Sequence, residues 1–323
     1  MRIRATAAAA VIMGAVALTA AAMPAAQASS PTASSHQTWQ LGTRFATAHP
    51  ATAARALTAR TQAGDPGQPY QLNATFSNLK IDSGKTAVAV GTTNVVHVPY
   101  SYTLTAVATN VSATDFVTGV GIYRGSSDAP SNELFGVNPA TCKVTSSTSG
   151  PDGSVQVENC AGTVDIDPTT DLTLADAGAK WHTEALAIAY NGQETSSNPD
   201  FTKVGIADVT GGTAPTLQRY SKLTVNASPE PVVKGKTVTV VGSLTRANWE
   251  THKYAGYTVQ PVKMQFRVKT SSTYTTLKTV TSDSHGNLKT TSTAKVDGYW
   301  RYSFAGTATT PAVSAAGDYV DVK

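Results

Sequence analysis

The second half of this chain alternates apolar and polar side chains with a period of two, and this pattern constrains the fold most. The large apolar residues of two runs stand at every second position: Met264, Phe266, Val268, Trp300, Tyr302 and Phe304. Successive side chains of a β-strand point to opposite faces of a sheet, so each run predicts a strand with one buried face. Seven such runs in about 100 residues are typical of an immunoglobulin-like β-sandwich. The pattern therefore predicts such a domain over residues 217–323, with Trp300 in its core.

Residues 70–212 carry a second series of short strand-like runs, separated by turn residues. The longest, 95–108, places Tyr100, Tyr102, Leu104, Ala106 and Ala108 on one face, and its Pro99 predicts a bend or a sheet edge. A helical period is absent, apart from one turn near residues 174–177. We therefore expect an all-β protein with two β-sandwich (immunoglobulin-like) domains.

The first 28 residues have the pattern of a secretory signal peptide. Arg2 and Arg4 precede an apolar run over residues 5–22, and Ala26-Gln27-Ala28 matches a cleavage site. No later stretch is apolar enough to cross a bilayer as a helix. The pattern predicts a secreted, extracellular protein without a membrane span, whose mature chain begins near Ser29.

Residues 29–69 are rich in Ser, Thr, Ala, Pro and Gln, which predicts a flexible linker or pro-segment. A weak basic amphipathic helix is the alternative, because the segment combines three Arg with a few apolar side chains: Trp39, Leu41, Phe45, Ala53 and Leu57. In that case it would serve as a removable pro-segment or as a tail that contacts the cell wall.

The charges are divided unevenly along the chain. Residues 1–64 hold five Arg and no acid. Residues 65–216 hold 6 Lys and Arg against 15 Asp and Glu, whereas residues 217–323 hold 14 Lys and Arg against 6 Asp and Glu. Two interpretations stay open: composition drift between independent modules, or an acidic and a basic domain that attract one another or different partners.

The only two cysteines, Cys142 and Cys160, flank the turn sequence Gly150-Pro151-Asp152-Gly153. In an exported chain such a pair predicts one disulfide, here across a hairpin. Closing a loop of about 20 residues stabilises a fold by about 3 kcal/mol in the chain-entropy model.

Several segments resemble a family of secreted actinobacterial proteins, in which a poorly characterised β-domain precedes an immunoglobulin-like tail. The segments that carry the resemblance are residues 221–231, 234–236, 297–301 and 314–322 in the tail, with 165–172 and Trp181 before it. The resemblance implies the two-domain architecture and brings no catalytic residue. Some members are loosely labelled calcium-binding.

One acidic run could hold a hard cation. Asp165, Asp167 and Asp171, with Asp176 further on, offer the carboxylate oxygens that Ca²⁺ prefers. The run does not fit the helix-loop-helix calcium loop, because Thr170 stands where that loop needs Gly. The alternative is a solvated acidic loop without a metal.

Aromatic residues between two tail strands form another candidate site. Trp249, Tyr254 and Tyr257 stand beside basic residues and could stack on sugars or meet an anionic polymer. The alternative is that Trp249 folds back as a loop plug or core anchor.

Catalysis is disfavoured. The six histidines show no metal-ligand spacing, a G-x-S-x-G elbow is absent, and the disulfide would consume both thiols. Nucleic acid is disfavoured too, because the tail's basic residues are dispersed and the compartment is extracellular. The leading hypothesis is a secreted, non-catalytic binding or structural protein whose partner is an extracellular polymer or protein. A calcium-dependent binding module and a hydrolase with an unrecognised site are the alternatives.

Overall fold

The computed structural model describes residues 69–323, apart from 112–114, 128, 152 and 194–199. The expected signal peptide at 1–28, and residues 29–68 of the expected linker, lie outside the described residues. No helix in the described ranges is long and apolar enough to cross a membrane.

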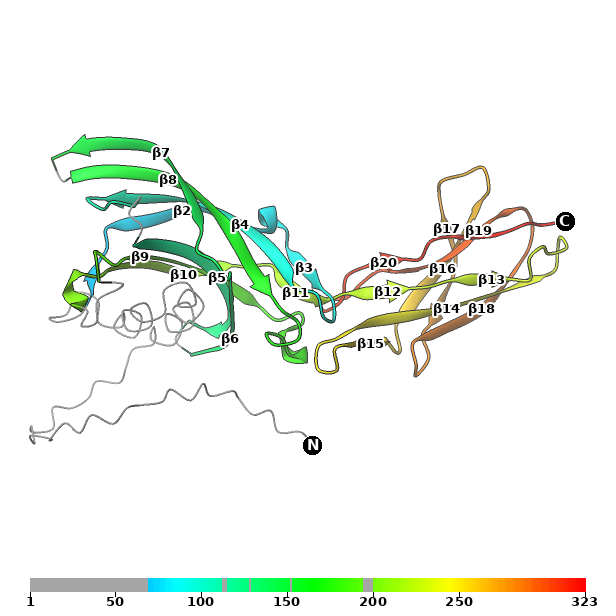
Figure 1. Ribbon diagram of the computed structural model, residues 1–323. Coiled ribbons are helices and arrows are strands. Elements are labelled where there is room, and N and C mark those ends of the chain that lie inside the picture. The colour runs from blue at the N-terminus through cyan, green and yellow to red at the C-terminus, as the bar shows by residue number, and fades with distance from the viewer. Residues whose placement is uncertain (1–68, 112–114, 128, 152, 194–199) are drawn as a thin grey trace, which may run out of the picture. The chain divides into compact units, whose positions relative to one another are not determined.

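The first part of the described chain folds into two facing antiparallel sheets, shown as two layers in Figure 1. One sheet has the order β1 (Tyr70–Gln71), β10 (Gly205–Thr213), β9 (Trp181–Ala189), β5 (Phe116–Ser126) and β6 (Ala129–Phe135), with β1 parallel to β10. The other has the order β2 (Ala74–Ile81), β4 (Val96–Val107), β8 (Gly153–Ile166) and β7 (Thr141–Gly150). A short parallel pair joins β3 (Ala87–Val90) to β11 (Thr216–Arg219).

Strand β4 contributes every second side chain to the core of this sandwich. Tyr100, Tyr102, Leu104 and Ala106 are all buried on its inner face, as predicted. Ala108 does not continue the strand, because β4 ends at Val107 and Ala108 has a left-handed backbone. Pro99 pairs with β8 only, since β2 ends opposite Tyr100, and a proline without an N–H is tolerated where one side is unpaired.

Within the described residues, three 3-10 helices connect the strands: η2 (Asp82–Gly84), η3 (Leu174–Asp176) and η4 (Phe201–Lys203). The helical turn expected near residues 174–177 is η3. The side chain of Asp176 closes its first turn by accepting a hydrogen bond from the Thr173 backbone N–H at 2.7 Å.

The tail is a second sandwich, and the all-β prediction is confirmed. Its first sheet gathers around β14 (Thr237–Asn248), with the neighbours β12 (Ser221–Leu223), β13 (Asn226–Ser228), β15 (Lys253–Gly256) and β18 (Asn287–Thr293). Its second sheet contains β17 (Thr275–Thr281), β16 (Pro261–Val268), β19 (Gly298–Phe304), β20 (Val313–Ser314) and β21 (Asp318–Val320).

The tail core follows the predicted alternation of β16 and β19. Met264 lies opposite Tyr302 and Phe266 opposite Trp300, and Trp300 is 1% exposed, which confirms its expected core position. Val268 was expected inside but is exposed, because it pairs with Gly298 at the end of the ladder, beyond the large core side chains.

Candidate functional site

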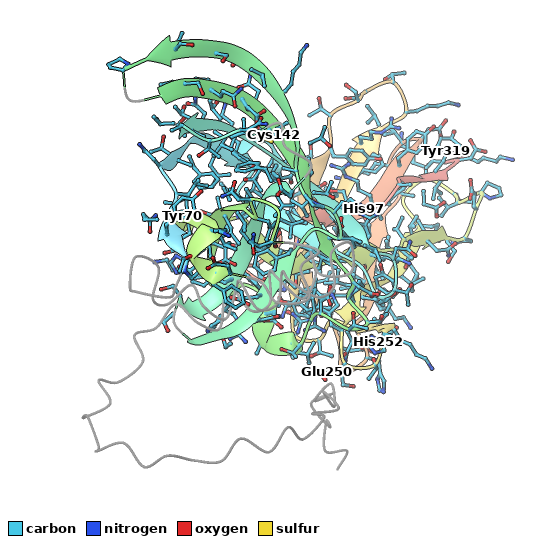
Figure 2. The ribbon with its side chains drawn as sticks, turned by 60° about the vertical axis from the view of Figure 1, so that its left-hand side comes forward. Tyr70, His97, Cys142, Glu250, His252 and Tyr319 are labelled. Carbon is cyan, nitrogen blue, oxygen red and sulfur yellow. A yellow bond between two sulfur atoms is a disulfide. The ribbon has the colours of Figure 1, made fainter. Side chains whose placement is uncertain are left out.

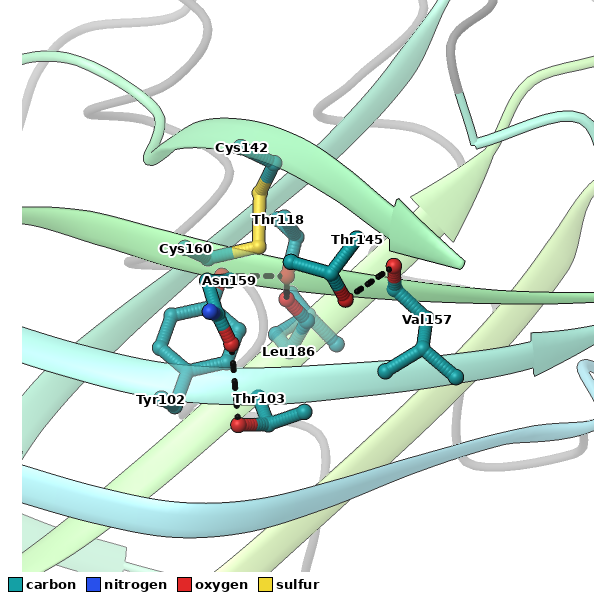
Figure 3. The surroundings of a disulfide bond; sticks show 9 residues. All are labelled: Tyr102, Thr103, Thr118, Cys142, Thr145, Val157, Asn159, Cys160 and Leu186. Carbon is teal, nitrogen blue, oxygen red and sulfur yellow. Dashed lines mark hydrogen bonds between the residues drawn. A yellow bond between two sulfur atoms is a disulfide. The ribbon is translucent and has the colours of Figure 1, made fainter. Parts of the chain in front are cut away.

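The predicted disulfide is confirmed. Cys142 of β7 lies directly opposite Cys160 of β8, and the two are bonded (Figure 3). The hairpin register that pairs Gly150 with Gly153 sets this alignment. Cys160 belongs to the first core, whereas the β7 side chains beyond the bridge are exposed. The bond therefore ties an outlying strand to the sandwich at its base.

Each of the three aspartates of the acidic run is held by hydrogen bonds within the protein. Asp165 contacts His97 of β4, with 2.6 Å between Oδ1 and Nδ1, and its Oδ2 accepts from the Val137 N–H at 2.8 Å; Figure 2 marks His97. Asp167 accepts hydrogen bonds from the Thr169 N–H and hydroxyl. Asp171 accepts from the Asp167 N–H at 2.8 Å.

The structure does not bring these carboxylates together as a ligand set. Asp165 lies within β8 and the other two lie in the turn after it, while Asp176 pairs with Arg124 at 2.8 Å. Among the described residues, the group of potential ligands that does converge is Cys142, Glu158 and Cys160, whose sulfurs are already bonded to each other. Calcium binding stays a prediction of the sequence, and the geometry of Asp165, Asp167 and Asp171 lends it no support.

The contacts of Asp165 predict a pH dependence. Burial would raise the pKa of its carboxyl, but the hydrogen bonds from His97 and Val137 outweigh burial and hold the pKa below its usual range. A lowered folded-state pKa stabilises the protein above the unfolded pKa of about 4, and this contribution is lost as the pH falls through the folded value. Denaturation from pH 6 to 2.5 should show Asp165→Asn less stable than wild type near pH 6, with a gap that closes at low pH. A gap of constant size would contradict this reading.

The aromatic site predicted from Trp249, Tyr254 and Tyr257 takes a different form. Trp249 is 0% exposed, and its indole Nε1–H donates to the Gly91 carbonyl at 2.9 Å, so it is a core anchor between the tail and the first core. Tyr254 is partly buried and packs on that same core, under the Lys222 ammonium. The burial of Trp249 and the packing of Tyr254 therefore leave no flat aromatic surface at these two residues on which a sugar could stack.

Tyr257 is buried against Arg246, whose guanidinium carbon lies 3.8 Å from the ring centre. Burial would raise the pKa of Tyr257, but a hydrogen bond with Thr307 and the charge of Arg246 outweigh it and lower the pKa. Nearby, burial and the charge of Arg246 lower the pKa of Arg219 to about 10, and its Nε donates to the Ala247 carbonyl at 2.6 Å. The side chains of Tyr257, Arg246 and Arg219 therefore stabilise the region where the tail meets the first core, and they are not free to bind a ligand.

A groove in the tail is the better candidate site. It has a volume of about 480 Å3 and opens between β17 and β18, where the two sheets of the sandwich part. The ring of Phe266 and the indole of Trp300, 4.5 Å apart between centres, form its floor. The residues of the walls and ends are Thr237, Leu277, Lys278, Thr291, Ser292, Thr293 and Lys295.

Trp300, which lines this groove, carries an indole donor that is not used within the protein. Its Nε1–H is buried and has no hydrogen-bond partner. Trp181 and Trp249, the other buried tryptophans, donate to the Asp176 and Gly91 carbonyls. An unpaired buried N–H costs about 1–3 kcal/mol, so an acceptor supplied in the groove would be favoured.

A bulge in β17 shapes one wall. Met264 pairs with Lys278 and Gln265 with Thr276, so Leu277 is the extra residue, 47% exposed at the groove. Lys278 shares the inward face with buried Met264 but reaches across the opening, where its ammonium donates to the Thr291 carbonyl of β18 at 2.7 Å. The sequence carried a signal for this feature, because the apolar residues Leu277 and Val280 are three apart and break the period of two.

Both strands beside the groove are sheet edges. Within the fully described tail, β17 pairs only with β16 and β18 only with β14. Each therefore presents backbone N–H and C=O groups to the gap, which is an arrangement that can accept an additional strand.

Comparisons with known proteins add little to the site. No protein-family model matches this sequence, and no curated protein matches it. Matching solved structures include the Escherichia coli adhesin FdeC (14% identity, TM-score 0.22, 78% of this chain and 65% of that chain). The D0-D1 domain of intimin matches at 13% identity and a TM-score of 0.24, over 76% of this chain and 98% of that chain. The ectodomain of mouse nectin-like molecule 4 matches at 12% identity and a TM-score of 0.22, over 78% of this chain and 65% of that chain. The chain thus spans about two thirds of FdeC and of the nectin-like ectodomain, and likeness at this level does not extend to function.

Proposed function

We propose that this chain is an extracellular, non-catalytic binding protein whose tail groove takes an extended acidic peptide segment of a partner protein. The observation that carries the proposal is that Trp300 lines an open groove and that its buried indole N–H lacks an acceptor within the protein. A carbonyl or carboxylate oxygen of the peptide would supply that acceptor.

The strand edges favour an extended peptide as the occupant. A peptide laid along β17 or β18 would gain main-chain hydrogen bonds from the edge, and every second side chain would point toward the groove floor. Phe266 and Leu277 offer apolar contact to those side chains. A sugar ring would find no exposed tryptophan face, because Trp300 is 1% exposed.

The charges favour an acidic peptide. Lys278 and Lys295 border the groove, whose lining includes no Asp or Glu. The tail as a whole carries 14 Lys and Arg against 6 Asp and Glu, so its field attracts anions toward the site.

The compartment and the chemistry of the lining agree with this role. A disulfide persists in oxidising surroundings, which supports the extracellular location expected from the sequence. The groove lining contains Thr, Ser and Lys but no His, Asp or Glu, the side chains that most often act as general bases.

Calorimetric titration tests the proposal. The mature chain should bind a synthetic peptide of about eight residues, in which Glu alternates with Val or Thr, matched to the seven residues of β17. Lys278→Gln combined with Lys295→Gln should weaken binding by about tenfold or more, because two groove charges are lost. Lys253→Gln combined with Lys263→Gln, exposed lysines outside the groove lining, is the charge-matched control and should have little effect.

Three outcomes would overturn the proposal. Equal weakening in both double variants would mean that the tail attracts anions in general and has no groove site. Undiminished binding in the groove variant would place the peptide elsewhere. Binding of an oligouronate in place of the peptide would refute the peptide as the occupant.

A further inference from the structure

The disulfide of the first sandwich has a buried carboxyl beside it. Among the described residues, one carboxyl oxygen of Glu158 and the sulfurs of Cys142 and Cys160 all lie within 4.8 Å of one another. Glu158 stands two positions before Cys160 on β8, so both side chains lie on the face of the strand that packs on the first core. An acid is therefore positioned next to the S–S bond that Figure 3 shows.

Glu158 is buried without a partner that would stabilise its charge. Its side chain belongs to a residue that is 3% exposed, and its Oε2 has no hydrogen-bond partner in the described part of the chain. The residues opposite it on the neighbouring strands, Leu104 and Val144, are apolar. A buried polar atom of this kind costs free energy, and where proteins retain one it often serves redox or proton-transfer chemistry.

The surroundings favour the protonated form of Glu158. Burial raises the pKa of its carboxyl above the usual range of a glutamate. The titratable groups that β4 turns toward the same core are Tyr102 and Tyr100. Burial raises the pKa of both hydroxyls, that of Tyr100 to about 12, so both stay neutral at physiological pH. The tyrosines therefore bring no charge to the carboxyl.

The charged groups on the other strands packed against β8 are engaged or turned away. Arg124 of β5 pairs with Asp176 at 2.8 Å. Lys143 of β7 and Glu133 of β6 each stand next to a residue that faces the core, so they lie on the opposite faces of their strands. Glu158 therefore keeps its proton to a higher pH than an exposed glutamate does.

The two sulfurs differ in their access to solvent. Cys142 is half-buried on the exposed edge strand β7, whereas Cys160 is 2% exposed. An entering thiolate reaches Cys142, which makes Cys160 the leaving sulfur. A thiolate released inside the core is costly, but a carboxyl is intrinsically about four pKa units more acidic than a thiol. Passing the Glu158 proton to Cys160 thus leaves the charge on the more stable anion.

We propose that the Cys142–Cys160 bond is an exchange site for a small extracellular thiol, with Glu158 as the proton donor to Cys160. The thiol loses its proton to water, and its thiolate attacks the Cys142 sulfur. As the new S–S bond forms, the Cys142–Cys160 bond breaks, its electron pair passes to the Cys160 sulfur, and that sulfur takes the Glu158 proton. The carboxylate regains a proton from water. The products are a mixed disulfide at Cys142 and a Cys160 thiol, and the exchange is independent of the tail groove.

The rate of reduction by dithiothreitol, divided by the concentration of its thiolate, tests the proton donor. Below the pKa of Glu158 the carboxyl holds its proton, so the wild-type mature chain should react about tenfold or more faster than Glu158→Gln. Above that pKa the ionised carboxyl has no proton to give and repels the thiolate, so the advantage should disappear. The corrected rate of Glu158→Gln should change little between pH 5 and 9.

Glu230→Gln changes an exposed glutamate of the tail and is the matched control, which should follow wild type at every pH. A ratio of wild-type to Glu158→Gln rates that is the same from pH 5 to 9 would overturn the proposal. If Glu158→Gln does not fold, wild type alone carries the test. Its corrected rate should then fall as the pH rises, and a constant rate would refute the donor.

Glutathione identifies the sulfur that is attacked. After brief exposure of the folded chain, acid quenching, alkylation with N-ethylmaleimide and peptide mapping should find glutathione on Cys142 and maleimide on Cys160. Glutathione on Cys160 would contradict the roles of the two sulfurs. A chain that forms no mixed disulfide while it stays folded would show that the bond is closed to thiols, and the proposal would fail.

Discussion

Replacing Trp249 by alanine should lower the unfolding free energy by about 3–5 kcal/mol, the range for a buried aromatic residue. Trp249 is 0% exposed, and its indole N–H donates to the Gly91 carbonyl at 2.9 Å. It follows β14 of the tail but belongs to the core cluster that contains Val88, Val90 and Leu104. The variant therefore removes a contact that the two sandwiches share.

Urea denaturation of the full chain measures the loss, and hydrogen exchange locates it. The amides of β3 should lose protection along with those of β14, because Trp249 touches both regions. Tyr220→Ala removes an aromatic side chain that is 46% exposed and should cost far less. Loss of protection confined to the tail would contradict the shared core.

Removing the Cys142–Cys160 disulfide has the second-largest expected effect. The bond closes a loop with a sequence separation of 18, and the chain-entropy model gives about 3 kcal/mol for loops of this size. The exposed side chains of β7 contribute little packing, so the disulfide and the backbone pairing with β8 hold this outer strand.

Denaturation of wild type and of the double variant Cys142→Ala, Cys160→Ala checks this value. We expect the β7 amides to exchange faster in the variant, while those of β19 in the tail change little. Reductant should destabilise wild type and leave the double variant unaffected. A variant as stable as wild type would show that backbone pairing with β8 alone holds the hairpin.

Much of the fold was readable from the sequence because local patterns determine it. The alternation of Tyr100, Tyr102, Leu104 and Ala106 gave the inner face of β4, and the turn between Gly150 and Gly153 aligned the two cysteines. The buried position of Trp300 was predicted from the same alternation of apolar and polar residues. In each case the relevant neighbours lie on the same strand or hairpin.

Features that depend on distant partners were not readable in this way. Trp249 bonds to residues 158 and 159 positions away, and no local pattern distinguishes such an anchor from a loop aromatic. Asp165 pairs with His97, 68 positions away, so an acidic run that suggested a cation site became a set of hydrogen-bonded carboxylates.

The groove illustrates the same limit. Trp300 was predicted to be a core residue, and it is one, but whether its N–H finds an acceptor depends on residues of other strands that pack around it. The bulge at Leu277 and the gap between β17 and β18 arise from the way the two sheets meet. In the sequence, the irregular spacing of Leu277 and Val280 indicated this bulge.

The indole N–H resonances of the mature chain, followed by NMR during titration with the acidic peptide, test the proposed binding function most directly. Among the described residues, Trp181, Trp249 and Trp300 are buried, and those at 181 and 249 already donate to carbonyls, so they serve as internal controls. We predict that the Trp300 signal moves downfield and saturates with the peptide, while those of Trp181 and Trp249 stay in place. Peptide binding that leaves the Trp300 signal unmoved, or no binding at all, would contradict the account.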